Sequence, residues 1–276
     1  MSHSRKVRAW PVRGVSERSR LGLGRGVLAT VPTLVQGRPF GLGWWHCSPL
    51  QGAHMGEMIE FKSNGGTCTG YLAGTSGPGV IVIQEWWGLV PHIKDIADRF
   101  AAEGFVALAP DMYHGEVTSE PDLAGKLLMS MNLATAGKDL SGAVDALQER
   151  TGRTKVGATG FCMGGGLALM AACLRPDAIS AVAPFYGGMR PDTVIECDNL
   201  AAVVEGHYAE TDRGTAAPEA VKELEVTLRA KGKNATFHVY PGTQHAFFND
   251  TRPEVYDAEV SQVAWDRMLA LFRAHL

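Results

Sequence analysis

The sequence predicts an α/β protein in which a mostly parallel β-sheet is covered by helices on both faces. Short apolar runs alternate along the chain with segments whose apolar residues recur at helical spacing, which is typical of such a sheet. The run over 80–84 begins with four consecutive apolar residues, as expected of a strand buried on both faces. The run over 155–159 leads through a tight turn directly into an apolar segment over 164–172, which predicts a strand followed at once by a helix.

In the first half of the chain, strands are identified by alternation or by continuous apolar runs, and helices by apolar residues three and four positions apart. Ile93, Ile96 and Phe100 fall on one face of such a helix. The expected elements are, in order, strands over 57–61, 67–72 and 80–84, a helix over 93–103, a strand over 105–109, and helices over 123–131 and 133–150.

In the second half, Pro218 marks the first turn of a helix, where a missing N–H costs nothing. The expected elements are a strand over 155–159, a helix over 164–172, strands over 179–185 and 201–205, a helix over 218–231, a strand over 236–240 and a long closing helix over 253–276. Parallel sheets of this kind bind ligands at the carboxyl ends of their strands, so we expect the functional residues in the loops that follow the strands.

The composition is that of a soluble globular protein, with 45% hydrophobic and 20% charged residues in a chain of 276 residues. No run of 18 or more apolar residues occurs, so we expect no membrane partner. The net charge of −3 combines about +7 in residues 1–54 with about −10 in residues 55–276. An acidic main domain argues against nucleic acid as a partner.

Residues 1–54 form a basic N-terminal segment, rich in Arg, Gly and Ser, without helical or strand periodicity. We interpret it as a disordered extension, with a targeting segment or a translation start placed too early as alternatives. The catalytic domain is expected to span 55–276. Removing everything before Met55 is therefore expected to leave a folded, active protein.

The five cysteines, Cys47, Cys68, Cys162, Cys173 and Cys197, are odd in number and irregularly spaced, and no C-x-x-C pair occurs. This spacing argues against a disulfide framework and against a zinc site. We therefore expect a cytoplasmic protein with no metal. The glycines at 164–166 lack the G-x-x-x-x-G-K-[ST] pattern of a phosphate-binding loop.

The most informative motif is Gly160-Phe161-Cys162-Met163-Gly164, which has the pattern G-x-S-x-G of a nucleophile elbow with cysteine in place of serine. A strand before it and a helix after it supply the context that this motif requires. Cys162 would lie at a helix N-terminus, where free N–H groups and the helix dipole favour a thiolate. A buried structural cysteine is the alternative reading.

An acid and a histidine follow Cys162 in the chain order of α/β-hydrolase triads. They are Asp212 and His245, each in a loop after a predicted strand. His245 would receive the thiol proton and later activate water, and Asp212 would orient the imidazole. Glu205, Glu210 and Asp198 remain alternatives for the acid, and His207 an alternative for the histidine.

Residues at the end of the 80–84 strand supply further candidate groups. Backbone N–H groups of Met163 and Trp86 are the expected oxyanion-hole donors. Glu85 would face the same site and, as a carboxylate beside a thiol, would keep Cys162 protonated until substrate arrives. A solvated or helix-capping carboxylate is the alternative for Glu85.

Four segments together resemble the dienelactone hydrolase family, in that family's order and across nearly all of residues 57–276. They lie at 84–88 (Gln-Glu-Trp-Trp-Gly), 110–113 (Pro-Asp-Met-Tyr), 160–165 (Gly-Phe-Cys-Met-Gly-Gly) and 240–249, which contains His245. The resemblance implies an α/β-hydrolase fold, a triad of Cys162, His245 and Asp212, and a thiol-gating role for Glu85. It also implies lactone opening through an acyl-cysteine, with no cofactor.

The sequence departs from family members that act on dienelactone itself. Those members hold the substrate carboxylate with two arginines, whereas this chain has His114 after Tyr113 and Asn249 after the histidine motif. Losing both guanidinium groups removes a bidentate carboxylate clamp. We therefore expect a neutral lactone or an aryl or acyl ester, bound in an aromatic pocket formed by Trp86, Trp87, Tyr113, His114, Phe247 and Phe248.

The predicted function is a cysteine-dependent hydrolase that opens lactones or cleaves carboxylic esters, acting as a monomer or homodimer on a small molecule. A thioesterase or carboxylesterase without lactone activity is one alternative. A non-catalytic ligand-binding or thiol redox-sensing protein on the same scaffold is another, because an exposed thiol of low pKa suits oxidation sensing.

Overall fold

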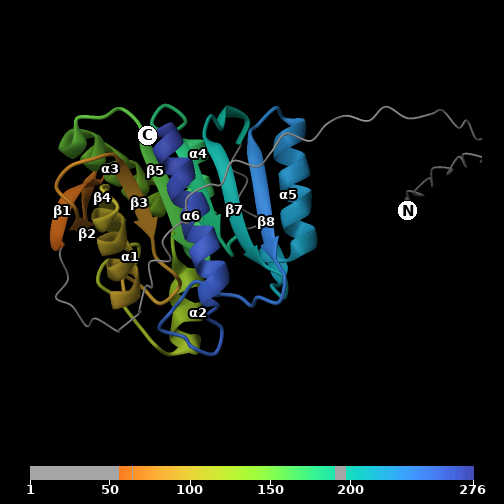
Figure 1. The fold of residues 1–276 in the computed structure, drawn as a ribbon. Helices are drawn as coiled ribbons and strands as arrows, with labels where there is room; N and C mark the ends of the chain where they lie inside the picture. Colours follow the sequence, from red (N-terminus) through yellow and green to blue (C-terminus); the bar gives the residue numbers. More distant parts are fainter. Residues whose placement is uncertain (1–55, 64, 190–196) are drawn as a thin grey trace, which may run out of the picture. The chain divides into compact units, whose positions relative to one another are not determined.

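The computed structural model describes residues 56–63, 65–189 and 197–276, and Figure 1 traces them in sequence colours. The basic segment 1–54 and Met55 lie outside the described residues, so the interpretation of that segment stays a prediction. Among the described residues, no helix combines the length and the apolarity needed to cross a membrane.

The described chain forms one eight-stranded sheet in the order β1-β2-β4-β3-β5-β6-β7-β8. The strands are β1 (Glu57–Ser63), β2 (Gly66–Ala73), β3 (Gly79–Ile83), β4 (Val106–Pro110), β5 (Val156–Phe161), β6 (Ile179–Phe185), β7 (Val203–Ala209) and β8 (Ala235–Tyr240). β2 runs antiparallel to both of its neighbours, and all other neighbouring pairs are parallel. The predicted mostly parallel α/β sheet is confirmed.

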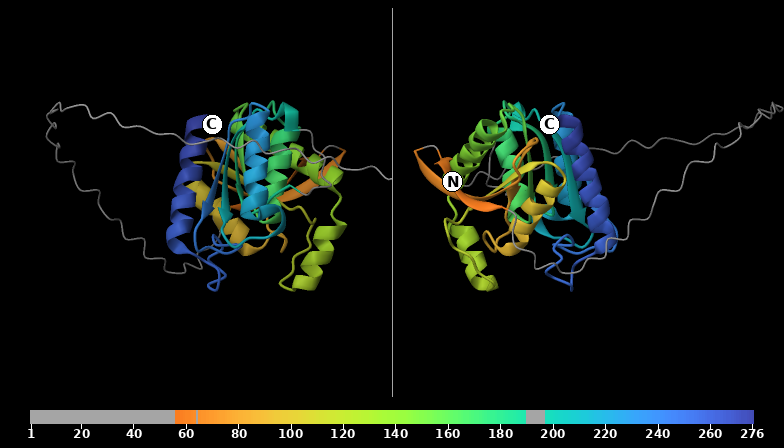
Figure 2. Two further views of the ribbon diagram at one scale, coloured as in Figure 1. Left: turned by 90° about the vertical axis from the view of Figure 1, so that its right-hand side faces the viewer. Right: turned by 60° about the vertical axis from the view of Figure 1, so that its left-hand side comes forward.

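Six α-helices and two short 3₁₀ helices accompany these strands in the described part of the chain. They are α1 (Pro91–Ala102), α2 (Pro121–Ser130), α3 (Leu133–Thr151), α4 (Met163–Leu174), α5 (Pro218–Ala230), α6 (Ala258–His275), η1 (Cys197–Asn199) and η2 (Gly214–Ala216). α6 and the pair α3 and α4 lie on opposite sides of the sheet in both views of Figure 2.

The central strands supply apolar side chains to both faces. Val80 and Val82 of β3 pack in the cluster that includes α1 and α6, whereas Ile81 and Ile83 pack in the cluster that includes α3 and α4. This is the two-residue alternation of a strand, and all four side chains are fully buried. A continuous apolar run therefore fits a strand covered on both faces, as the sequence predicted.

The last helix begins later than predicted. The expected helix over 253–276 starts at Ala258, because residues 253–255 form a turn and Asp257 caps the helix by accepting a hydrogen bond from the Val260 N–H at 3.0 Å. The predicted strand over 201–205 likewise lies at Val203–Ala209, so the loop after β7 begins near Glu210. This shift matters for the site, because Asp212 lies in that loop.

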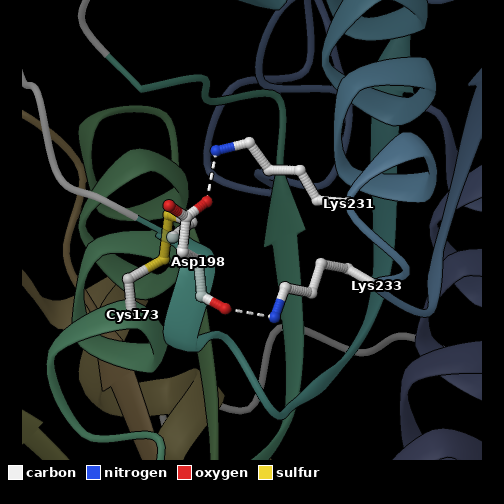
Figure 3. The surroundings of a disulfide bond; sticks show 5 residues. Cys173, Asp198, Lys231 and Lys233 are labelled. Carbon is white, nitrogen blue, oxygen red and sulfur yellow. Dashed lines mark hydrogen bonds and ion pairs between the residues drawn. A yellow bond between two sulfur atoms is a disulfide. The ribbon is translucent and has the colours of Figure 1, made fainter.

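The structure contains a disulfide that the cysteine spacing did not predict. Cys173 at the end of α4 is bonded to Cys197 of η1, 24 residues later. Figure 3 shows the neighbouring Asp198, whose carboxylate pairs with Lys231 and whose carbonyl accepts from Lys233. The expectation that the chain has no disulfide is therefore wrong, because the helix end and η1 meet only in the folded chain.

Candidate active site

Cys162 lies at the sharp turn between β5 and α4. Its backbone has φ of 55° and ψ of −118°, a conformation that few non-glycine residues adopt and that stores strain. A Cβ on Gly160 would lie 2.1 Å from the carbonyl oxygen of Gly164, and one on Gly164 would lie 2.4 Å from that of Ile83. Only glycine fits at either position, so the predicted elbow and its glycine spacing have a steric cause.

His245 and Asp212 meet beside this turn. Asp212 follows β7 and His245 follows β8, and Nδ1 of His245 lies 2.9 Å from Oδ2 and 3.0 Å from Oδ1 of Asp212. The Asp212 side chain is only 7% exposed, whereas the His245 side chain is 41% exposed. The Asp212 carboxylate thus orients the imidazole ring through Nδ1, and Nε2 remains available for proton transfer.

The charged form of His245 is strongly favoured. Burial opposes the imidazolium, but hydrogen bonds to Asp212 and to Cys162 outweigh it and raise the pKa of His245 to about 10. The structure therefore brings together Cys162, His245 and Asp212, which are far apart in sequence: Asp212 is hydrogen-bonded to His245, and Cys162 lies close enough to raise the pKa of the ring. Such an arrangement can move a proton away from the thiol and hold it on the ring.

These three residues open onto a cavity of about 380 Å³. Its described walls are mostly aliphatic and sulfur-containing, and its charged and polar side chains are Tyr186, Asp212, Arg213, Thr215 and His245. A further, more open depression of about 730 Å³ lies against Asp212 and His245 and is bordered by Arg213 and Arg252. The described residues that line the cavity are Leu128, Met129, Met131, Leu133, Cys162, Met163, Gly166, Leu167, Met170, Tyr186, Gly187, Gly188, Met189, Asp212, Arg213, Thr215, Ala216 and His245.

Glu85 directly follows β3 and is buried, with 1% of the residue exposed. Its Oε2 accepts a hydrogen bond of 2.9 Å from the side-chain amide of Asn249, whereas Oε1 has no partner among the described residues. Glu85 also raises the pKa of the buried Tyr186 hydroxyl, second only to burial itself. The alternative of a solvated surface carboxylate is therefore wrong.

The two expected oxyanion donors lie at adjoining backbone segments. Met163 is the first residue of α4, where N–H groups have no partner within the helix. Trp86 follows Glu85, and the close approach of Gly164 to the carbonyl oxygens of Ile83 and Gln84 places the start of α4 against the end of β3. This juxtaposition is compatible with a shared oxyanion hole, and the assignment stays a prediction.

The predicted aromatic pocket is largely wrong. Phe247 and Phe248 are buried in the core cluster between the sheet and helices α1 and α6, where Phe248 stacks on Phe161 with ring centroids 5.3 Å apart. They point into the protein because their apolar rings pack against β5 and β6 rather than facing solvent. Trp86, Trp87 and Tyr113 are also absent from the cavity lining, although the Tyr113 hydroxyl reaches Sδ of Met163, which does line it, at 3.3 Å.

His114 is likewise not a cavity residue. Its Nε2 lies 3.1 Å from Oδ2 of Asp139, on α3. Cys68 of β2 completes a second group with the same residue types as the first. Burial, aided by Asp139 and Asp111, raises the pKa of the Cys68 thiol to about 12, and Cys68 lies within a strand rather than at a helix N-terminus. Cys68 thus lacks the features that make a thiol nucleophilic.

The other candidates for the catalytic acid and histidine have hydrogen-bond or ion-pair partners other than Cys162 and His245. Glu205 pairs with His238 at 2.8 Å, Glu210 accepts from the Gly242 N–H at 2.8 Å, and Asp198 pairs with Lys231. His207 is fully buried, and burial holds its pKa well below the usual value. A histidine kept neutral in the core and bonded to Tyr240 cannot serve at the cavity.

Sequence reasoning missed Tyr186 and Arg213. Tyr186 follows β6 with a φ of 34°, its ring centroid lies 5.1 Å from that of His245, and its buried hydroxyl has no partner among the described residues. The rule that site residues follow parallel strands points to Tyr186, since it comes directly after β6. Arg213 follows the predicted acid, and only the folded loop places it at the cavity.

Comparisons with known proteins agree with this architecture. The model of the Dienelactone hydrolase family matches residues 68–276. "Protein usf" of Aquifex pyrophilus is 41% identical over 232 residues, covering 80% of this chain and all of the relative. A "Putative carboxymethylenebutenolidase" of Aquifex aeolicus is 37% identical with the same coverage. The structure is also similar to that of a "Putative Dienelactone Hydrolase" from Klebsiella pneumoniae, with a TM-score of 0.71, 28% identity, and coverage of 81% and 100% of the two chains.

Proposed function

The chain belongs to the dienelactone hydrolase family of ester-bond hydrolases, and we propose that it cleaves lactones or carboxylic esters through an acyl intermediate on Cys162. The proposal rests on one structural observation. Cys162 occupies a strained turn at the start of α4 and lines a cavity together with His245, whose ring Asp212 orients and whose pKa Cys162 helps to raise. Nucleophile, base and orienting acid are thus in the relation that acyl transfer requires.

The reaction begins when the Cys162 sulfur attacks the carbonyl carbon while His245 holds the thiol proton. The resulting oxyanion is stabilised by the N–H groups of Met163 and Trp86. When the tetrahedral intermediate collapses, the bond to the leaving oxygen breaks, and His245 gives that oxygen the proton. For a lactone the leaving oxygen stays attached to the acyl chain, so the ring opens on the enzyme.

Water then completes the cycle. His245 removes a proton from water, the hydroxide attacks the acyl-cysteine carbonyl, and the collapse of the second intermediate releases the acid and restores the thiol. The net change is the addition of one water to one ester bond. No step requires a group other than the side chains named and the backbone donors.

Glu85 is assigned the gating role. A buried carboxylate with one unpaired oxygen disfavours a second negative charge nearby, so it opposes the thiolate while the cavity is empty. When substrate enters the cavity, its carbonyl carbon is the electrophile that the thiolate attacks, so the thiolate is needed only then. This gating would protect Cys162 from oxidation between turnovers.

The cavity wall favours an apolar acyl or lactone group. Met131, Met163, Met170 and Met189 contribute flexible thioether side chains, which adapt to irregular ligands. Apart from the catalytic His245, Arg213 is the only cation in the described lining. A neutral ester or lactone is therefore the proposed substrate, with the apolar part seated against the methionines.

The test compares hydrolysis of a neutral chromogenic ester by the wild type, Cys162→Ala and the matched control Cys68→Ala. Loss of the nucleophile is expected to lower kcat by on the order of 10⁴-fold or more, whereas Cys68→Ala keeps the wild-type rate. Mass spectrometry after rapid quenching should find the acyl group on the peptide that contains Cys162. Full activity of Cys162→Ala, or an acyl group on Cys68, would overturn the proposal.

A panel of lactones, aryl esters and thioesters then separates the substrate classes. The proposed function expects the highest kcat/KM among neutral lactones or oxygen esters. A protein that turned over none of them, but whose Cys162 was readily oxidised by peroxide, would be a thiol sensor rather than a hydrolase.

A further inference from the structure

A second group of potential ligand atoms lies outside the active-site cavity. It comprises Sγ of Cys68, a ring nitrogen of His114 and a carboxylate oxygen of Asp139, all within 4.8 Å of one another. We propose that these three side chains bind a divalent metal ion of the zinc type. None of them lines the cavity described above, so the proposed metal site is separate from the proposed catalytic group.

The buried carboxylate of Asp139 is the strongest indication of a cation. Asp139 is 2% exposed and lies on the face of α3 that packs toward β1. Its Oδ1 accepts a hydrogen bond from the Ser63 hydroxyl, whereas Oδ2 has no hydrogen-bond partner among the described residues and faces Nε2 of His114 at 3.1 Å. A buried carboxylate is costly unless a positive charge meets it, and the His114 ring supplies that charge only when it is protonated, whereas a divalent ion always supplies it.

The three donors suit zinc. Thiolate sulfur, imidazole nitrogen and carboxylate oxygen are its usual ligands, at about 2.3, 2.0 and 2.0–2.2 Å, so tetrahedral donors lie roughly 3–4 Å from one another. The present spread of up to 4.8 Å would close with a small movement of His114, whose side chain is 50% exposed. Water would occupy the fourth position on this exposed side.

The charges also balance around such an ion. A thiolate and a carboxylate together neutralise a divalent cation, and the imidazole binds as the neutral ring. The Ser63 hydroxyl holds the second carboxylate oxygen and so orients the ligand, as outer contacts of metal ligands commonly do. At present the Cys68 thiol makes only weak contacts, to the carbonyl oxygens of Thr69 at 3.3 Å and Asp111 at 3.7 Å.

Metal binding would tie three separate elements together. Cys68 belongs to β2, Asp139 to α3, and His114 to the loop after β4. That loop is already shaped by Asp111, whose carboxylate accepts from the N–H groups of Tyr113 and Gly115. Because Tyr113 contacts Met163 beside the nucleophile, the ion would act as a clamp that stabilises one flank of the active site.

The experiment titrates chelator-treated full-length protein with Zn²⁺ alone, and with Co²⁺ as a spectroscopic probe of thiolate ligation. We expect one ion per chain, a higher Tm on binding, and a cobalt–thiolate charge-transfer band. His114→Ala is the primary variant, since an exposed side chain can be removed without disturbing the core. It should weaken zinc binding at least ~10-fold, the minimum that the loss of even an outer contact produces.

Matched variants locate the ion. His275→Ala removes an exposed histidine at the end of α6 and should bind Zn²⁺ like the wild type. Cys68→Ser should abolish the cobalt–thiolate band and Cys162→Ala should keep it, which separates this site from the other cysteine–histidine–aspartate group. Absence of stoichiometric binding, or a band lost with Cys162→Ala and kept with Cys68→Ser, would overturn the proposal.

Discussion

The side-chain amide of Asn249 donates a hydrogen bond of 2.9 Å to Oε2 of Glu85, joining two buried residues 164 positions apart. Asn249 is the residue that the sequence comparison with the family predicted to replace a substrate-binding arginine. Its other amide atom, Oδ1, accepts hydrogen bonds from the backbone N–H and the hydroxyl of Thr251. Asn249 therefore couples the predicted gating carboxylate to the loop that carries His245.

The first prediction concerns this contact. Asn249→Asp keeps an acceptor for Thr251 but turns a carboxylate oxygen toward Glu85, so two buried acids would face each other. We expect a loss of about 1–3 kcal/mol in the free energy of unfolding at neutral pH, measured by urea denaturation. Part of that loss should return as the pH falls and one carboxyl takes up a proton. Asn234→Ala, at an exposed position, serves as the control, and equal stability of the two variants would contradict the prediction.

The second prediction tests the acid of the triad. Asp212→Asn removes the charge that orients and stabilises the protonated His245, so kcat should fall on the order of 10⁴-fold. Glu205→Gln and Glu210→Gln alter the neighbouring acids that bind His238 and the Gly242 N–H, and each should keep kcat within a few-fold. Steady-state kinetics of the three variants on one neutral ester shows which of the three carboxylates is required for catalysis. A large drop confined to Glu205→Gln or Glu210→Gln would move the role away from Asp212.

The third prediction concerns pH and stability. The pKa of His245 rises from 6.5 to about 10 on folding, so the folded protein binds a proton more tightly than the unfolded chain. The contribution of His245 to stability is complete below pH 6.5 and is lost as the pH rises toward 10. The difference in unfolding free energy between wild type and His245→Gln should therefore shrink across this range. If the difference in unfolding free energy between the two proteins grew with pH, the prediction would be wrong.

The fourth prediction concerns the Cys173–Cys197 disulfide. Cross-links that close loops of this size stabilise proteins by about 2–4 kcal/mol, so Cys173→Ser should lower the unfolding free energy by a comparable amount under oxidising conditions. A reducing agent should destabilise the wild type and leave Cys173→Ser unchanged. Thiol counting in unfolded, unreduced protein provides the direct check. If the reductant has no effect on wild-type stability, the bond does not form in solution.

The fifth prediction concerns Arg213, the one cation in the described cavity lining besides the catalytic His245. Because the proposed substrate is neutral, Arg213→Gln should leave kcat/KM for a neutral ester within a few-fold of the wild-type value. A substrate series in which one member carries a carboxylate shows whether the guanidinium binds anions. A loss of at least ~10-fold confined to the anionic member would instead identify Arg213 as a carboxylate anchor and revise the substrate class.

Local sequence pattern determined much of the fold. Alternation and continuous apolar runs located the strands, because side-chain periodicity follows directly from strand geometry. The Cys162 elbow was visible for the same reason, since its glycines are required by contacts within a few residues. Chain order then indicated Asp212 and His245, because the carboxyl ends of parallel strands meet at one edge of the sheet.

Other features depend on contacts between segments that no local pattern connects. The burial of Phe247 and Phe248 is decided by packing against β5 and β6, and the disulfide by the meeting of α4 with η1. The grouping of Cys68, His114 and Asp139 arises because β2 pairs with β4 while α3 packs across β1, which brings together residues up to 71 positions apart. Sequence alone thus determined which residue types stand after which strand, since that information is local. Tertiary structure decided which way their side chains point, because the direction depends on burying apolar surface from the whole chain.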